Sequence, residues 1–260
     1  MRSHHHGDFD AAALSGNASV CLPAKECAGT VGAIVEAVQA LPFVGEVVVV
    51  DAASADGTAD VALAAGAVVH QEAELVPDAG PVRGKGDAMW RALTVLREDV
   101  VCFVDADTED FGAHFVTGLC GPLLTDDDVD FVKAFYRRPL GEDPAGGGRV
   151  NHLMARPALR VFFPELADVR QPLAGEVAAR RELLERLPFA TGYGVETAML
   201  IDVWRAVGLE RMAQVDLGTM SNAHQPLQAL TPMAEAVLRV IASRAGVDVE
   251  GVPERPAHRP

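Results

Sequence analysis

Short apolar runs alternate along the first half of the chain with segments whose apolar residues recur at helical spacing. The runs are rich in Val, as expected for strands buried on both faces of a parallel sheet. They occupy residues 18–22, 46–51, 67–70 and 100–104. Between the first two, five aliphatic residues of the 30–41 segment fall on one helical face. Strands that alternate with helices at this spacing predict an α/β fold with a mostly parallel sheet flanked by helices.

The second half of the chain shows a weaker form of the same pattern. Strands are predicted over 131–136 and 215–218, and helices over 111–123, around 183–187, from 192 and over 233–241. The two ends of the chain carry no such pattern. Residues 1–17 are polar and small, and residues 246–260 contain three Pro. We therefore expect a lead-in along the surface at the N-terminus and a disordered, frayed tail at the C-terminus.

Charge and hydropathy narrow the class of protein. The net charge of −15 argues against a nucleic acid as the partner, because binding phosphates would require a basic face. No apolar run approaches the roughly 20 residues that span a bilayer, and the N-terminus lacks the apolar core of a secretion signal. The four cysteines have no metal-binding spacing, which favours free thiols in a reducing compartment. We predict a soluble, cytoplasmic protein that binds neither nucleic acid nor membrane.

The predicted strand over 100–104 ends in two carboxylates, Asp105 and Asp107. Ligands of open α/β sheets gather beyond the carboxyl ends of the strands. This Asp-Ala-Asp segment can therefore hold a divalent cation and, through it, a diphosphate. The alternative is that Asp107 and Thr108 only cap the next helix, since Asp is common in the turn after a strand. We interpret the pair as a metal and nucleotide site.

Two glycine-rich loops carry basic residues that could meet an anion. The Arg83-Gly84-Lys85-Gly86 loop lets backbone and ammonium approach a diphosphate closely, and a solvated loop with an incidental lysine is the alternative. This loop lacks the Walker sequence. The segment from Gly146 to Arg149 precedes a helical pattern, so backbone amides and a guanidinium could face an anion at the helix start. A merely flexible connection is the alternative there.

Several short motifs follow one another in order along the chain. They are Leu22-Pro23-Ala24, Arg83-Gly84-Lys85-Gly86, Asp105-Ala106-Asp107, Lys133-Ala134-Phe135-Tyr136-Arg137-Arg138-Pro139-Leu140, Gly146-Gly147-Gly148-Arg149-Val150, Gln171-Pro172-Leu173-Ala174-Gly175-Glu176 and Gly192-Tyr193-Gly194-Val195-Glu196. A lone Asp-x-Asp would be weak evidence. The ordered set resembles the glucosyl-3-phosphoglycerate and mannosyl-3-phosphoglycerate synthases, retaining glycosyltransferases of the GT-A fold, over about residues 18 to 244.

The resemblance implies a division of labour within one GT-A domain. Residues 18–140 would bind the nucleotide sugar, a UDP-sugar donor, and 141–245 would form the acceptor-binding part. The nucleotide-sugar site would include Pro23, Ala24, Glu26, Ser54, Lys85, Asp105 and Ala106. The catalytic residues would be Asp107, which binds Mg²⁺ or Mn²⁺, Lys85, which stabilises the leaving group, and Glu196, which meets sugar hydroxyls or transition-state charge. The acceptor, a small phosphorylated molecule, would contact Gly148, Arg149, Asn151 and His224.

The end of the implied site departs from the family sequence. Where the family has a metal-binding His and an acceptor-binding Asn, this chain has Asn222 and His224. We take His224 as the second metal ligand and Asn222 as the alternative. Asn151 also replaces a Thr after the acceptor loop. All three changes fall where acceptor and metal are expected to meet.

Three functions compete on this basis. The first is metal-dependent transfer of a hexose from a nucleoside diphosphate sugar, UDP-glucose being favoured, to 3-phosphoglycerate. The second is the same transfer to a different small acceptor in specialised metabolism, and the third is a catalytically silent nucleotide-sugar-binding homologue. The resemblance also implies a homodimer. No motif fixes the sugar, because discrimination among hexoses depends on a few hydroxyl contacts.

Overall fold

An eight-stranded sheet forms the centre of the computed structural model, which describes all residues except 223, 250 and 260. Its strands lie in the order β1-β9-β6-β7-β5-β2-β3-β4, and β10 pairs with β8 in a separate two-stranded ribbon. The strand bounds are β1 Arg2–His5, β2 Ala18–Ala24, β3 Val44–Asp51, β4 Val68–Gln71, β5 Val100–Phe103, β6 Phe131–Arg137, β7 Val177–Arg180, β8 Phe189–Ala190, β9 Met212–Thr219 and β10 Glu254–Arg255. Neighbouring strands of the large sheet run parallel except at β7, which is antiparallel to both β5 and β6. This arrangement confirms the predicted α/β class with a mostly parallel sheet.

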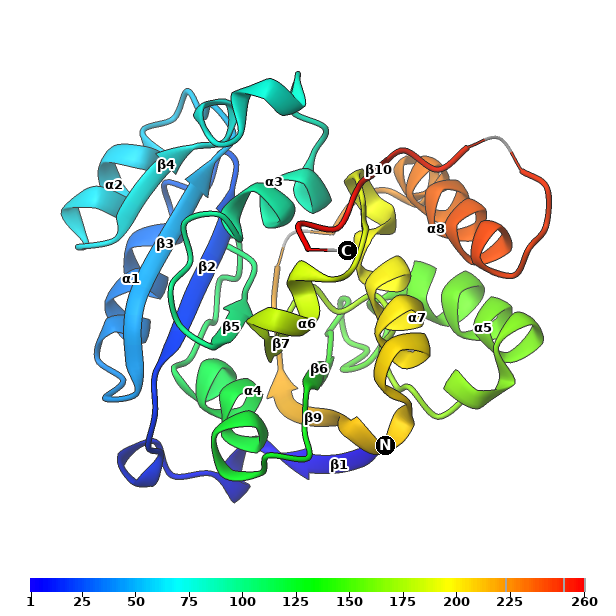
Figure 1. Ribbon diagram of the computed structural model, residues 1–260, viewed down its shortest axis with the longest axis horizontal. Coiled ribbons are helices and arrows are strands. Elements are labelled where there is room, and N and C mark those ends of the chain that lie inside the picture. The colour runs from blue at the N-terminus through cyan, green and yellow to red at the C-terminus, as the bar shows by residue number, and fades with distance from the viewer. Residues whose placement is uncertain (223, 250, 260) are drawn as a thin grey trace.

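Helices cover both faces of the sheet (Figure 1). The α-helices are α1 Val31–Gln39, α2 Thr58–Ala64, α3 Lys85–Ala92, α4 His114–Thr125, α5 Arg156–Phe162, α6 Arg181–Glu185, α7 Val195–Val207 and α8 Thr231–Arg244, and a π-helical turn, Asn151–Ala155, precedes α5. Short 3₁₀ helices span His6–Asp8, Ala11–Ala13, Glu72–Glu74, Pro77–Ala79, Pro164–Leu166, Gly192–Gly194, Leu209–Arg211 and Leu227–Leu230. Among the described residues, none of these helices combines the length and apolar character needed to cross a bilayer.

Alternate residues of the central strands supply two separate cores. Along β5, Val100 and Cys102 belong to the core under α1 and α4, whereas Val101 and Phe103 belong to the core under α3 and α7. All four are at most 1% exposed. This two-sided burial explains why β2, β3 and β5 read as continuous apolar runs in the sequence. It also anchors the carboxyl ends of these strands, where polar side chains follow.

Two strands of the sheet were not predicted from the sequence. The N-terminal residues expected to form a surface lead-in include β1, which pairs in parallel with β9 at the edge of the sheet. The segment before α6 forms β7, which lies between β5 and β6. Both strands have only four residues. Such short segments carry little periodicity, and their pairing depends on the unsatisfied edges of distant strands.

The expectation of a frayed tail over 246–260 is wrong, because described residues near the C-terminus pack against α3. In Figure 1 this segment, drawn in red, runs beside α3. Arg255, which is 5% exposed, donates from Nε and Nη2 to the carboxylate of the buried Asp87 at 2.6 and 2.9 Å. The ring of His258 stacks on Trp90 with 4.5 Å between centroids. Burial alone would raise the pKa of Asp87, but the hydrogen bond from Arg255 and the charge of Arg91 lower it.

We expect Arg255→Ala to lower the free energy of unfolding by about 3 kcal/mol, because it removes a charge partner of the buried Asp87 carboxylate. The measurement is urea denaturation followed by circular dichroism. Arg259→Ala is the matched control, since that side chain is 67% exposed in its ion pair with Glu185, and exposed pairs contribute 1 kcal/mol or less, roughly. Equal losses for the two variants would contradict this account of the tail.

Candidate active site

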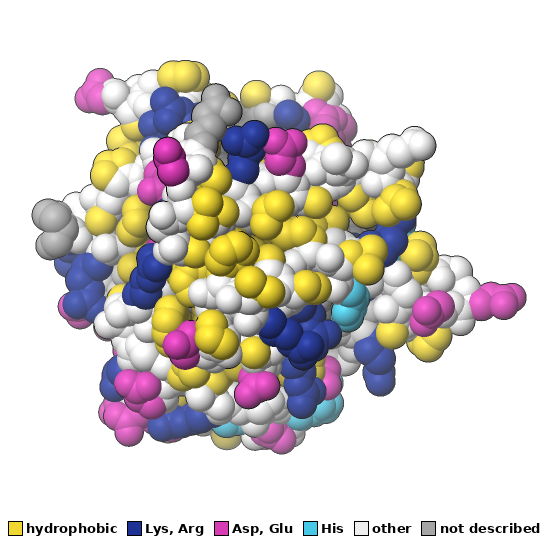
Figure 2. Space-filling view, turned by 90° about the vertical axis from the view of Figure 1, so that its right-hand side faces the viewer, with side chains coloured by type: hydrophobic (Ala, Val, Ile, Leu, Met, Phe, Trp, Pro, Cys, Tyr) yellow, Lys and Arg dark blue, Asp and Glu magenta, His cyan; other side chains and the backbone are white. Residues whose placement is uncertain are grey.

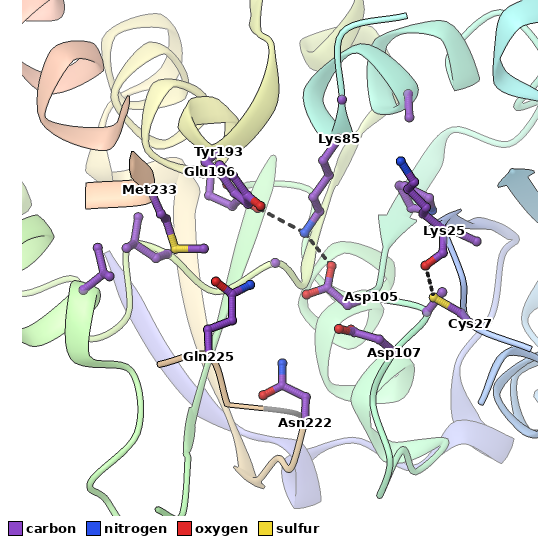
Figure 3. Close-up of a pocket in the computed structure, with 18 of the residues that line it drawn as sticks. Lys25, Cys27, Lys85, Asp105, Asp107, Tyr193, Glu196, Asn222, Gln225 and Met233 are labelled. Carbon is purple, nitrogen blue, oxygen red and sulfur yellow. Dashed lines mark hydrogen bonds and ion pairs between the residues drawn. The ribbon is translucent and has the colours of Figure 1, made fainter. Parts of the chain in front are cut away.

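A cavity of about 690 Å³ opens where β2, β3, β5 and β6 end. Asp105 and Asp107 follow β5 and line it, as the sequence predicted, and Ala106 lies between them in the same wall. Figure 3 shows both carboxylates below Lys85, which enters from the start of α3. The residues expected to act on the donor therefore converge on one hollow at the predicted edge of the sheet.

Lys85 is held between two carboxylates. Its Nζ forms an ion pair with Asp105 and lies 3.0 Å from Oε1 of Glu196, which projects from the first turn of α7. Burial alone would lower the pKa of Lys85, but the charges of Asp105 and Glu196 outweigh it and raise that pKa. The lysine is therefore a fixed positive charge beside the cavity. Gly175 makes the close approach possible, because a Cβ there would lie 2.3 Å from Asp105 Oδ2 and 2.6 Å from Lys85 Nζ.

The backbone before Lys85 is fixed by the C-terminal segment. The N–H of Arg83 donates to Asp87 Oδ2 at 2.8 Å, and Arg255 donates to the carbonyl of Pro81 at 2.9 Å as well as to Asp87. The predicted flexible loop thus ends at Lys85, where α3 begins. This placement brings the lysine to the helix N-terminus, whose partial positive charge favours an anion.

Asp107 forms no ion pair among the described residues, although the charges of Lys85 and Arg138 act against that of Asp105. Burial and the neighbouring Asp105 raise its pKa. Asn222 lies below it in Figure 3, and the Asn222 Oδ1 accepts a hydrogen bond from Arg138, which leaves that oxygen a second lone pair. Among the described residues no three His, Cys, Asp or Glu side chains converge on a metal site. The donors nevertheless fit Mg²⁺ or Mn²⁺, because Mg²⁺ is commonly held by one or two protein oxygens together with water and substrate phosphates.

His224 lies at the rim of the cavity and is exposed. Its Nε2 is 2.7 Å from the carbonyl oxygen of Pro139, so this ring nitrogen already has a hydrogen-bond partner. The assignment of His224 as a metal ligand stays a prediction. Both candidates line the cavity, and we favour Asn222 because an amide oxygen is a ligand of the kind that Mg²⁺ prefers.

Three of the four residues assigned to the nucleotide end of the site line the cavity directly, namely Pro23, Ala24 and Glu26. Ser54 is not among the described residues that do so. Its Oγ instead accepts a hydrogen bond from the backbone N–H of Glu26 at 2.9 Å. The Glu26 Oε1 in turn accepts from the N–H of Ala55 at 2.9 Å. Ser54 therefore supports the loop that carries Glu26, and direct contact with a nucleotide stays a prediction.

The residues predicted to form the acceptor end, Gly148, Arg149 and Asn151, all line the same cavity. Gly148 has a φ of +66°, a conformation that favours glycine. Arg149 donates from Nη2 to the carbonyl of Gln225 at 2.5 Å, which ties the predicted acceptor loop to the segment after Asn222. The structure thus brings the residues predicted for the donor and those predicted for the acceptor into one cavity.

Sequence reasoning gave no role to a buried polar group beneath the site. The Tyr136 hydroxyl donates to Glu176 Oε2 at 2.8 Å, and Lys133 Nζ donates to the carbonyl of Ala174 at 2.6 Å. Burial, with a further contribution from the charge of Asp105, raises the pKa of Glu176 to about 7. Burial lowers the pKa of Lys133 to about 8. The quoted motifs contain all of these residues, but only the insertion of β7 beside β6 shows that they meet.

The raised pKa of Glu176 predicts a pH-dependent stability. Its carboxyl ionises at its ordinary value of 4.5 in the unfolded chain and at about 7 in the folded protein. The folded state therefore holds the proton more tightly, and this group's contribution declines as the pH rises from about 4.5 to about 7. In Glu176→Gln, which keeps an acceptor for Tyr136, we expect that decline, on the order of 2 kcal/mol, to disappear.

The measurement is urea unfolding at a series of pH values across that window. The exposed Glu182→Gln variant is the control and should follow the wild-type curve. A Glu176→Gln curve parallel to the wild type would contradict the assigned pKa.

The comparisons with known proteins agree with this geometry. The family model "Glycosyl transferase family 2" matches residues 19–184. Glucosyl-3-phosphoglycerate synthase of Mycolicibacterium smegmatis is 45% identical over 251 residues, which cover 94% of this chain and 83% of that protein. The Mycobacterium tuberculosis enzyme of the same name is 43% identical over 256 residues, which cover 95% of this chain and 79% of that protein.

Solved structures match over nearly the whole chain. Glucosyl-3-phosphoglycerate synthase from Mycobacterium tuberculosis, in complex with Mn²⁺, UDP-glucose and phosphoglyceric acid, has a TM-score of 0.89 at 37% identity and covers 99% of this chain and 98% of that one. Mannosyl-3-phosphoglycerate synthase from Rubrobacter xylanophilus has a TM-score of 0.90 at 42% identity, with 99% and 96% covered. These matches confirm the GT-A fold and the resemblance found in the sequence. The chain belongs to glycosyl transferase family 2 and, within it, to the family of the glucosyl-3-phosphoglycerate synthases.

Proposed function

We propose that the protein is a retaining glucosyltransferase that moves glucose from UDP-glucose to 3-phosphoglycerate with the help of Mg²⁺ or Mn²⁺. The observation that carries the proposal is the single cavity in which Lys85, Asp105 and Asp107 face the loop of Gly148 and Arg149. Relatives with 43–45% identity carry this activity in their names. The related Mycobacterium tuberculosis enzyme has been crystallised with both substrates and Mn²⁺.

The reaction breaks the bond between the sugar C1 and the diphosphate and forms a bond from C1 to the acceptor hydroxyl. Negative charge develops on the leaving diphosphate, where the fixed positive charge of Lys85 stabilises it. Asp107 and Asn222 would hold the divalent cation, which neutralises the diphosphate when bound. In a front-face path the leaving phosphate takes the proton of the acceptor hydroxyl, so the protein needs no nucleophile. Glu196 is placed to meet sugar hydroxyls or the positive charge that develops on the sugar.

A different small acceptor is the second candidate. The observation that favours it is the substitution pattern at the acceptor end, where Asn151 is buried with its Oδ1 unpartnered among the described residues. A changed pattern of hydrogen-bonding groups at residue 151 would suit an acceptor substrate with different polar groups. The donor side of the cavity is unaffected by this choice.

The test is an assay of UDP release with UDP-glucose, Mg²⁺ and a panel of acceptors. We expect turnover with 3-phosphoglycerate. Release only with another acceptor, such as glycerol 3-phosphate, would favour the second candidate. Calorimetric binding of UDP without turnover on any acceptor would favour a catalytically silent homologue and overturn the proposal.

We further infer that the enzyme works as a homodimer. The π-helical turn, α5 and α8 expose apolar side chains, among them Leu153 and Val161, which are 75% and 74% exposed. Figure 2 views this side of the molecule and shows apolar side chains gathered across its middle. Apolar surface of this kind is typical of protein–protein contacts, and a second copy is the partner that the family resemblance implies.

We expect the wild type to have the mass of a dimer in light scattering and Leu153→Glu/Val161→Glu to have that of a monomer, because a buried charge opposes association. The control is Leu63→Glu on α2, which is 63% exposed on another side of the molecule. A monomeric wild type would contradict the inference.

The four cysteines, all described and all unpaired, fit a reducing compartment, and we place the enzyme in the cytoplasm.

A further inference from the structure

A second cavity of about 340 Å³ adjoins the acceptor end of the active site. We call it the arginine cavity, because its wall includes Arg137, Arg138, Arg156 and Arg170. It lies where β6 ends and the π-helical turn before α5 begins. Tyr136, Arg138, Gly148, Asn151 and Gln171 line both this cavity and the active site. The two hollows are therefore neighbours that share a wall.

The positive charge in the arginine cavity has no acidic partner in the described part of its wall. No Asp or Glu is found among the described residues that line it, although the chain has 37 acidic and only 22 basic residues. The Nε atoms of Arg138 and Arg156 are buried without a hydrogen-bond partner among the described residues. Burying a charged donor without a partner costs several kcal/mol, roughly. Like charges gathered in one hollow add to that cost.

The remaining contacts hold the guanidinium groups in place without neutralising them. The Arg170 guanidinium carbon lies 4.5 Å from the centre of the Phe135 ring, a cation–π contact that keeps the positive charge. Arg138 donates to the neutral amide of Asn222. The cavity therefore presents the half-buried Arg138 and Arg156 together with the exposed Arg170, charged donors of the kind that recognise phosphate and carboxylate groups in two-point contacts.

We propose that the arginine cavity binds a phosphate or carboxylate anion at a site that shares Gly148 with the active-site cavity but does not include Arg149. The anion is either a second charged group of the acceptor, a reading that rests on the proposed function, or a separate small anion that does not depend on it. In either case its charge compensates Arg138, Arg156 and Arg170. Because Asn151 and Arg138 border both cavities, occupation of this site is coupled to the acceptor end of the active site.

The first experiment detects the site without turnover. Inorganic phosphate is titrated into the protein and followed by ³¹P NMR line broadening, first with the wild type and then with Arg149→Gln, in which binding at the acceptor loop is removed. We expect Arg149→Gln to retain phosphate binding. Adding Arg156→Gln or Arg170→Gln to that variant should weaken phosphate binding roughly tenfold. Adding Arg160→Gln, an exposed arginine on the same helix, is the matched control and should leave binding unchanged.

The second experiment identifies the source of the anion. If Arg156→Gln and Arg170→Gln raise the KM for the acceptor roughly tenfold without changing UDP binding, the site takes a group of the acceptor. If KM is unchanged while the effect of added inorganic phosphate on the rate is lost, it takes a separate anion. Loss of all phosphate binding in Arg149→Gln alone, or equal behaviour of the Arg156, Arg170 and Arg160 variants, would overturn the proposal. Absence of turnover in the wild type would instead count against the proposed function, since the NMR titration needs none.

Discussion

The Lys85→Ala variant is expected to lose on the order of 10³-fold in kcat/KM, roughly 4 kcal/mol of transition-state stabilisation. Lys85 is the positive charge that α3 places between Asp105 and Glu196. Removing it leaves these two carboxylates facing the diphosphate, so the variant loses an attraction and gains a repulsion at the group that accumulates negative charge. The loss should fall mainly on kcat, because this charge develops in the transition state.

The measurement is steady-state UDP release, with the melting temperature recorded to confirm folding. Lys25→Ala is the matched control, because Lys25 also lines the cavity but is an exposed side chain. Its kcat/KM should stay within about threefold of the wild type, as expected for an exposed charge. Comparable losses for the two lysines would show that general positive charge in the cavity, and not the placement of Lys85, sets the rate.

Asp107→Asn is expected to lower activity at ordinary Mg²⁺ or Mn²⁺ concentrations by 10³-fold or more, roughly. The substitution keeps the size of the side chain but removes the charge that attracts the cation. Burial and the charge of Asp105 already raise the pKa of Asp107. A bound cation would offset the repulsion between these two carboxylates and so stabilise the wild-type site. The variant should partly recover as the metal concentration rises.

The control is Asp127→Asn, whose side chain is fully exposed and lies in the turn between α4 and β6. A second comparison separates the two candidate ligands. Asn222→Ala should raise the concentration of Mn²⁺ needed for half-maximal rate more than His224→Ala does. Full activity of Asp107→Asn without added metal would show that the reaction does not require a cation at Asp107.

The strands that the sequence predicted most clearly, β2, β3 and β5, are buried on both faces along most of their length. Val47 to Val50 of β3 and Val100 to Phe103 of β5 belong alternately to the two cores, and continuous Val-rich runs in the sequence reflect this. The four residues of β7 are Val-Ala-Ala-Arg, of which only Val favours a strand, whereas Ala and Arg favour helix. Their conformation is decided by β5 and β6, which are far away in the sequence. The tail was missed for a related reason, since the Arg255–Asp87 pair joins residues 168 positions apart.

The candidate site was predictable where function depends on short motifs. Asp105, Asp107 and Lys85 stand beside glycines or at strand ends, so the local pattern marked them as candidates, and the family resemblance then assigned them to one site. Glu176 and Tyr136 were not predicted as site residues, because their meeting depends on the antiparallel pairing of β6 with β7. The hydrogen bond of His224 with Pro139 could not be predicted from the sequence either, because it depends on the conformation of the loop after β9.

We expect a cation held by Asp107 to bind the diphosphate of a UDP-sugar at the carboxyl edge of the sheet. Anomalous diffraction from crystals grown with UDP and Mn²⁺ tests it most directly. We predict a manganese peak in contact with the Asp107 carboxylate, with the uridine against Pro23 and Ala24. Nucleotide bound elsewhere, or a manganese ion that leaves Asp107 without a contact, would contradict the account.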